Sequence, residues 1–271
     1  MSVDVLSIIL LLPGLVIVLI SMASILIWRS ASRVEVRWFG VGAALWVAAV
    51  LLKLGCGLLI NASVIGCLRY GLRPPYFIPA AGAFIGVESC AFEIGGTWIA
   101  ARLCPRLGRD AGRAIAVGVG AGAFEALVLS LLLLLGALAL LVGVEDAGEA
   151  RQVIQTSAAV TPLVWLVWPV ERLIALLCHA STRALVLLGV AKGRPSMVLC
   201  GLLLFAWTDG LAGSFLVAGS HRSQSIWWLE LAVLPGALVS IAILHWCYRR
   251  WPGRVEAEVA QPPWFTRPGE A

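Results

Sequence analysis

Seven long apolar runs constrain the fold of this chain more than any other feature of its sequence. Each reaches the roughly 20 residues that a helix needs to cross a hydrocarbon core of about 30 Å. The runs are 5–28, 38–60, 76–103, 114–143, 159–190, 196–219 and 227–247. They are far longer than barrel strands and show no alternation, and lipid admits only helices and closed barrels. The sequence therefore predicts an all-α, polytopic transmembrane bundle of about seven spanning helices.

The composition excludes the common soluble classes. Of the 271 residues, 61% are hydrophobic and 13% are charged, and the mean hydropathy is +0.95. Soluble domains average about 45–50% apolar and about 25% charged residues. A cytosolic enzyme, a disulfide-stapled secreted module and a disordered chain are thereby excluded. The net charge of +5 is better explained by basic cytoplasmic connections of a membrane protein than by a nucleic-acid-binding surface. We therefore expect a lipid bilayer as partner and no nucleic acid.

The basic residues between the runs predict an N-out/C-in orientation, because cytoplasmic connections accumulate Lys and Arg. In this orientation most cations fall on the cytoplasmic side: Arg29, Arg33, Arg37, Arg102, Arg106, Arg109, Arg113, Lys192, Arg194, Arg249, Arg250, Arg254 and Arg267. The outer connections hold Arg69, Arg73, Arg151 and Arg222. We expect one transmembrane domain over 1–251 and a short cytoplasmic tail over 252–271. The preference for Arg over Lys is typical of GC-rich bacterial genomes and favours a bacterial cytoplasmic membrane.

Ionisable residues lie deep inside several of the predicted helices. In the centre of a bilayer each costs on the order of 3 kcal/mol by insertion scales. The set is Lys53, Glu88, Glu93, Glu125, Glu171, Arg172, His179 and Asp209. At about 1.5 Å per residue, Glu93 and His179 lie nearer the cytoplasmic side, whereas the other carboxylates fall near one central plane.

Helical spacing suggests how some of these residues meet. Arg172 and His179 are seven residues apart and share one face of their helix. Gly118 and Gly122 form a small-xxx-small pair that lets helices approach closely, and Glu125 lies on the same face. An unpaired buried cation is costly, so we expect Arg172 to contact a carboxylate. The expected partners are Glu93, Glu125, Glu171 and Asp209. The cluster is either an ion-pair network that fixes helix register, a catalytic cavity or a transport path.

Four short sequence motifs occur along the chain in the same order as in a known protein family. They are Phe92-Glu93-Ile94-Gly95-Gly96-Thr97, Gly120-Ala121-Gly122-Ala123-Phe124-Glu125-Ala126, Glu171-Arg172 followed by His179, and Phe205-Ala206-Trp207-Thr208-Asp209. Over roughly residues 38–215 the chain resembles the YhfC-type family of intramembrane peptidases, which is related to the CAAX-protease-like membrane proteases.

The resemblance implies a glutamate that acts as general base on water in a histidine-lined cavity, with a metal in some members. It points to Glu93, Glu125 and His179 as catalytic residues. Glu88, Glu171, Arg172 and Asp209 would form a supporting polar network around them. The chain departs from the family pattern where Ile94 replaces a Glu, Thr97 an Arg, and Ala121 and Phe205 two His. The site is therefore expected to be degenerate.

General chemistry agrees with this expectation. A catalytic zinc needs about three protein ligands, usually including two His, and His179 is the one histidine deep in the predicted bundle. A site of one His with several carboxylates suits magnesium, calcium or manganese better than zinc. We therefore expect no metal and no other cofactor.

Three functions stay open at this stage. The leading hypothesis is a degenerate peptidase-like protein that binds a membrane substrate or partner. The alternative is an active intramembrane protease that uses glutamate chemistry, with or without a metal. A small transporter is the third, although inverted repeats and paired broken helices are lacking.

Overall fold

Helices make up nearly all of the part of the chain that the computed structural model describes, which is 3–142, 147–219 and 224–251. The elements are α1 (Val3–Ser32), α2 (Arg37–Gly71), α3 (Pro74–Leu103), the 3-10 turn η1 (Pro105–Gly108), α4 (Ala111–Leu141), α5 (Ala147–Val160), α6 (Val164–Ala191), α7 (Pro195–Val217) and α8 (Trp227–Arg250). Every α-helix except α5 is long and apolar enough to cross a membrane. The predicted all-α bundle of seven spans is confirmed, and the protein is an integral membrane protein. Its N-out/C-in orientation stays a prediction.

Helix α6 occupies the centre of the bundle. It packs against α4, α7, α8, α3 and α1, and every residue from Cys178 to Gly189 is buried. Because a central helix is shielded from lipid on all sides, it can carry polar side chains that would be too costly on the outside. His179 and Arg183 lie on this segment.

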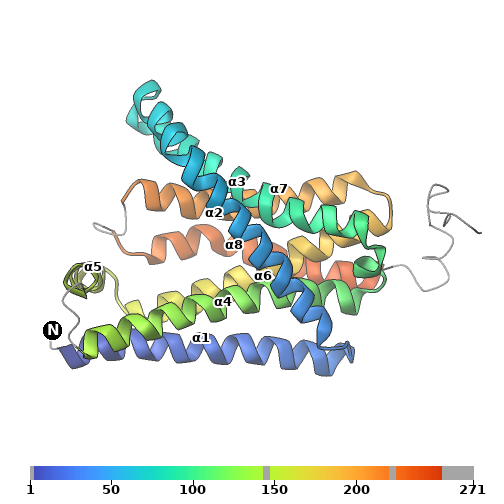
Figure 1. Cartoon of the computed structure of the whole chain (residues 1–271), viewed down its shortest axis with the longest axis horizontal. Coiled ribbons are helices and arrows are strands. Elements are labelled where there is room, and N and C mark those ends of the chain that lie inside the picture. The colour runs from blue at the N-terminus through green and yellow to red at the C-terminus, as the bar shows by residue number, and fades with distance from the viewer. Residues whose placement is uncertain (1–2, 143–146, 220–223, 252–271) are drawn as a thin grey trace, which may run out of the picture.

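Helix α2 is the least buried of the spans. It crosses the bundle obliquely, and its C-terminal end projects together with the start of α3 (Figure 1). Its N-terminal half is held against α4 by backbone approach: a Cβ on Gly42 would collide with the Val117 carbonyl, and one on Gly120 with the backbone of Phe39. The remaining length of α2 exposes leucines such as Leu58 and Leu59 to the lipid.

Several predicted helix bounds were wrong. The second helix continues to Gly71 instead of ending near residue 60, so Arg69 lies in its last turn and not in an outer loop. The run 159–190 is interrupted, because α5 ends at Val160 and α6 begins only after Leu163, which has a positive φ of 50°. Helix α5 itself was not predicted, and it lies crosswise to α1 and α4 (Figure 1). The predicted tail at 252–271 lies outside the described residues.

Candidate functional site

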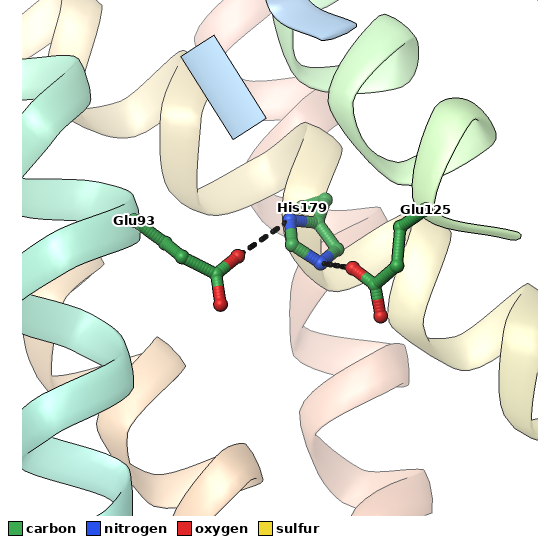
Figure 2. Close-up of side chains that lie close together, drawn as sticks. All are labelled: Glu93, Glu125 and His179. Atoms are coloured by element: carbon green, nitrogen blue, oxygen red, sulfur yellow. Dashed lines mark ion pairs between the residues drawn. The ribbon is translucent and has the colours of Figure 1, made fainter. Parts of the chain in front are cut away.

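Glu93 on α3, Glu125 on α4 and His179 on α6 meet in the interior of the bundle (Figure 2). One ligand-type atom from each lies within 4.8 Å of the others. The side chains of Glu93 and His179 are 6% and 5% exposed, and that of Glu125 is 18% exposed. The structure thus brings together the three residues that the sequence marks as catalytic candidates.

Two glycines allow α4 to approach α6 at the level of this cluster. A Cβ added to Gly118 would lie 2.6 Å from the Ala180 Cα, and one added to Gly122 would lie 3.0 Å from the Leu176 Cα. Such distances leave no room for a larger residue, as expected at a small-xxx-small contact. Glu125 follows Gly122 by three residues, so the close contact sets its carboxylate directly against His179.

The Glu125 carboxylate is the most heavily bonded group in the cluster. Its Oε1 accepts a hydrogen bond of 2.6 Å from Arg172 Nη1. Its Oε2 accepts one of 3.1 Å from Trp46 Nε1 and lies 2.5 Å from His179 Nε2. Arg172 also pairs with Glu171 at 2.5 Å, so the expected contact between Arg172 and a carboxylate is present. Both oxygens of Glu125 are therefore engaged.

Three charged groups surround the His179 ring: Arg183 and Glu93 at Nδ1, the latter with its Oε2 4.0 Å away, and Glu125 at Nε2 (Figure 2). Its Nδ1 is hydrogen-bonded to Arg183 Nη1. A guanidinium can only donate, so Nδ1 must accept and Nε2 must carry the ring proton. That proton is donated to Glu125 Oε2. This tautomer of His179 is assigned from the hydrogen-bond network, and in this arrangement both ring nitrogens are engaged.

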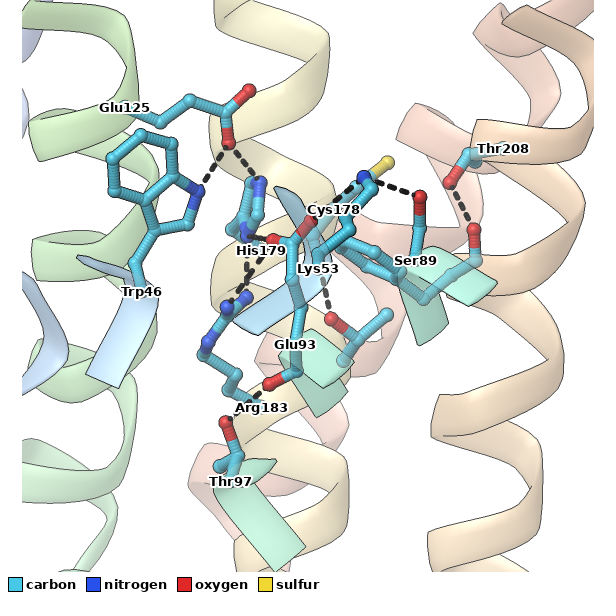
Figure 3. Close-up of polar contacts among 12 residues, drawn as sticks. Trp46, Lys53, Ser89, Glu93, Thr97, Glu125, Cys178, His179, Arg183 and Thr208 are labelled. Atoms are coloured by element: carbon cyan, nitrogen blue, oxygen red, sulfur yellow. Dashed lines mark hydrogen bonds and ion pairs between the residues drawn. The ribbon is translucent and has the colours of Figure 1, made fainter. Parts of the chain in front are cut away.

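Glu93 is held more loosely by two cations (Figure 3). Its Oε1 lies 3.6 Å from Lys53 Nζ, and its Oε2 lies 3.6 Å from Arg183 Nη2. Lys53 in turn donates a hydrogen bond of 2.6 Å to Ser89 Oγ. Among the described residues, Glu93 Oε2 and Arg183 Nη2 have no hydrogen-bond partner. Glu93 is thus the one member of the cluster with an oxygen that is not already bonded.

The remaining predicted residues lie around this centre. Glu88 is buried and accepts a hydrogen bond of 3.1 Å from Asn61 on α2, apart from the partners of Glu93. Asp209 is half-buried on α7 and does not belong to the group whose ligand atoms converge within the described residues.

Of the four positions that the sequence resemblance marks as departures, Phe205 and Thr97 contact residues of the cluster. The Phe205 ring packs edge-on against His179 with 5.1 Å between centroids. Thr97 donates a hydrogen bond to the Glu93 backbone carbonyl. Ile94 and Ala121 are fully buried.

The sequence analysis did not identify Arg183 as part of the site, and it placed His179 at a different depth in the membrane from Glu125. Arg183 is fully buried and contacts both His179 and Glu93. Its position four residues after His179, one helical turn on, was the available signal. The depth estimate placed His179 on a different level from Glu125, yet their polar atoms touch. The depth estimate counted residues along straight, upright helices. Helix tilt and the length of the side chains bring the polar atoms of the two residues to the same level.

Glu93, Glu125 and His179 form a group of three side chains that could hold a metal ion, although His179 and Glu125 are hydrogen-bonded to other residues as they are arranged. Both ring nitrogens of His179 are engaged by Arg183 and Glu125, whereas Glu93 and Glu125 keep acceptor capacity on their carboxylates, so an ion would have to displace a hydrogen bond of His179. The carboxylates of Glu93, Glu125 and Glu171 are paired with three cations: Lys53, Arg172 and Arg183. A divalent ion at this place would therefore compete with these cations for the carboxylates.

Comparison with known proteins identifies one family. A model described as YhfC intramembrane metalloprotease matches residues 16–233, a range that contains the whole cluster and extends beyond the 38–215 of the sequence resemblance. No curated protein and no solved structure matches the chain.

Proposed function

This chain belongs to the YhfC intramembrane metalloprotease family, and from that premise we propose that it keeps the membrane fold of the family without hydrolysing peptide bonds. In this proposal it acts by binding a membrane-embedded segment of a substrate or partner protein. The polar centre then serves recognition and helix register instead of catalysis.

The bonding of His179 is the observation that carries this proposal. A general base or a metal ligand needs a free lone pair on the imidazole. Arg183 occupies the lone pair of Nδ1, and the proton on Nε2 is directed to Glu125. Since Arg183 is fully buried, solvent cannot draw it away from His179. The imidazole is therefore locked as a structural link between α4 and α6.

The neighbourhood of His179 supports the same conclusion. Phe205 stands where the resemblance would offer an imidazole, and its ring covers one side of His179. The Arg183 guanidinium also lies 5.9 Å from the Phe205 ring centroid. An aromatic ring and a fixed cation thus fill space that a hydrolytic site would need for water and substrate.

The exposure of the cluster supports a binding role. Lys53 keeps 28% of its side chain exposed, although it lies within a span. Lys53 donates to Ser89 and pairs with Glu93, but an ammonium has three protons to donate, and a partner helix that carries an acceptor would add a bond on its exposed side. The open side lies along α2, which is the least buried span. We therefore place the bound segment beside α2, with a polar group facing Lys53.

The catalytic half of the proposal is tested by metal content and peptide cleavage. We expect the protein extracted from membranes to hold no stoichiometric zinc and to leave a transmembrane peptide uncut with added zinc or manganese. One zinc per chain that is lost in His179→Ala but kept in His245→Ala would refute the proposal. Cleavage that depends on His179 would refute it equally.

The binding half is tested with a model transmembrane peptide in vesicles, followed by energy transfer from a labelled protein. A leucine-rich peptide with one central Asp should bind more tightly than the same peptide with Leu. Lys53→Met should remove this difference, and thermal unfolding checks that the variant is folded. Equal binding of both peptides to the wild type would contradict the proposed site.

One observation favours active proteolysis as the second candidate. Glu93 Oε2 and Arg183 Nη2 both lack a hydrogen-bond partner among the described residues, and at 3.6 Å they are too far apart to bond each other directly, so Glu93 Oε2 remains able to accept from a water molecule. A carboxylate that holds water is the minimum for a general base. Cleavage abolished by Glu93→Gln but retained in Glu88→Gln would establish this alternative.

A further inference from the structure

Glu230, in the first turns of α8, is a buried carboxyl group outside the polar cluster of Glu93, Glu125 and His179. The residue is 4% exposed, and neither Oε1 nor Oε2 has a hydrogen-bond partner among the described residues. Buried polar side-chain atoms of native proteins nearly always have a partner. Two unbonded oxygens on one carboxyl group inside a membrane bundle therefore require a physical reason.

The start of α8 is fixed in place, so Glu230 cannot turn freely toward solvent. Ile226 N donates a hydrogen bond of 3.2 Å to Thr161 Oγ1. Trp227 Nε1 donates one of 2.6 Å to the Pro162 carbonyl. Both bonds hold the N-terminal end of α8 to the turn that precedes α6.

The face of α8 that carries Glu230 is turned toward α6. Val233 lies three residues later on the same face and belongs to a buried cluster with residues of α6. Val170 and Leu229 pack against this same cluster, and they directly precede Glu171 and Glu230. Glu171 and Glu230 therefore lie at the same level of neighbouring helices.

The charged neighbours of Glu230 come from α6. Helix α8 packs against α4, α6 and α7, and within the described residues of these helices Glu171 and Arg172 act electrostatically on Glu230. Arg172 already forms short pairs of 2.5 Å with Glu171 and 2.6 Å with Glu125. In the part of the chain that the structure describes, Glu230 thus has no cation of its own.

The charged and the neutral form of Glu230 differ sharply in free energy. A buried carboxylate ion without a partner is strongly destabilising, and the negative charge of Glu171 adds repulsion. A carboxylic acid avoids both effects, because the proton removes the charge and makes one oxygen a hydrogen-bond donor.

We propose that Glu230 binds a proton and that this proton keeps Arg172 in the polar cluster. While Glu230 is neutral, it does not compete with Glu125 for the guanidinium. When the proton is released to water, the Glu230 carboxylate attracts Arg172 and weakens its bond with Glu125, the carboxylate that His179 Nε2 contacts. Glu230 is therefore a proton-controlled switch that acts on the cluster through Arg172. This inference does not depend on whether the chain hydrolyses peptides.

Infrared spectroscopy tests the bound proton directly. At about pH 7, where an exposed glutamate is ionised, the wild-type spectrum minus that of Glu230→Gln should show the carbonyl band of a carboxylic acid. The control is Glu35→Gln, which removes an exposed carboxylate and should show the band of an ionised carboxylate. An ionised carboxylate in the Glu230→Gln difference would overturn the proposal.

Thermal unfolding tests the pH dependence. A proton that the folded chain binds and the unfolded chain releases makes stability fall as the pH rises, whereas Gln mimics the neutral acid at every pH. Relative to Glu230→Gln, the wild-type Tm should therefore fall by about 2–8 °C between about pH 6 and about pH 9.

A second variant tests for an ion pair of Glu230. Arg222 is the basic residue that most closely precedes Glu230 in the sequence, and it lies outside the described residues. Arg222→Gln should leave the pH dependence of Tm unchanged. An equal loss of Tm at neutral pH in Arg222→Gln and Glu230→Gln would identify Glu230 as an ionised partner of Arg222 and overturn the proposal.

Histidine NMR tests the link through Arg172. With isotope-labelled histidine, the His179 signal is assigned from its loss in His179→Ala. It should shift over the same pH range in the wild type and stay in place in Glu230→Gln, an effect that a purely structural Glu230 would not produce. Equal shifts in the two proteins would refute the switch.

Discussion

The substitution Arg183→Met removes the buried cation that links His179 to Glu93. Met keeps an apolar stem of similar length, so the change removes charge and donors more than volume. His179 Nδ1 then loses its donor, and Lys53, at 3.6 Å, becomes the nearest remaining cation to Glu93. Breaking a buried pair by removing one partner costs about 3–5 kcal/mol, because the other charge stays buried without compensation.

This energy corresponds to a clear shift in thermal unfolding. At about 2–4 °C per kcal/mol for a chain of this size, Tm in detergent should fall by about 6–20 °C. Adding Glu93→Gln to Arg183→Met removes the uncompensated charge, so the double variant should regain about 1–3 kcal/mol relative to the sum of the single effects. Arg194→Met, which removes an exposed arginine, should change stability by less than about 0.5 kcal/mol.

The same variant provides a second readout. Without Arg183, His179 Nδ1 regains a lone pair, and Glu93 and Glu125 lie close enough to join it around an ion. Added zinc should therefore raise the Tm of Arg183→Met and leave the wild type unchanged. An unaltered Tm in Arg183→Met, or a double variant as unstable as the sum of its parts, would refute the ion-pair reasoning. Zinc stabilisation of the wild type would refute the locked state of His179.

Two further predictions concern the contacts of α4. Arg172→Gln should lower Tm strongly, whereas Arg172→Gln with Glu125→Gln should lower it less, and equal losses in the two proteins would contradict the pairing at 2.6 Å. Gly118→Ala should destabilise the protein because its Cβ would meet the Ala180 backbone at 2.6 Å, whereas Gly136→Ala in the same helix meets nothing within 4 Å and should be neutral or up to about 1 kcal/mol stabilising. Both are measured by thermal unfolding, and a stabilising Gly118→Ala would disprove the close approach.

The membrane architecture was largely predictable because hydropathy acts over long windows. Seven apolar runs became seven spans, since lipid leaves the backbone no alternative to helix. Helix α5 escaped prediction because its 14 residues are polar and too short for a span. The break at Leu163 escaped as well, because the apolar run continues through the turn while the backbone adopts a positive φ.

The sequence was sufficient to predict that Arg172 forms an ion pair, but not how the side chains of the site are arranged in space. The cost of a buried cation sufficed to pair Arg172 with a carboxylate. Helix tilt, which sequence spacing does not encode, decided that Glu125 would touch both Arg172 and His179. Trp46 and Lys53 reach the cluster from α2 because glycines at the α2–α4 contact set its crossing, and such contacts depend on three-dimensional packing. Arg183 was missed although its helical spacing from His179 indicated a shared face.

The length of α2 links the polar cluster to the thickness of the membrane. Its 35 residues form a helix about 52 Å long, well beyond a hydrocarbon core of about 30 Å, so it must tilt or project. Trp46 and Lys53 lie on this helix and bond to Glu125 and Ser89. A thicker bilayer favours a more upright α2 and strains these bonds, and a thinner one favours a greater tilt. Moving the protein to a membrane of different sterol content or acyl-chain length would therefore change the tilt of α2 and the bonds of Trp46 and Lys53, without any ligand.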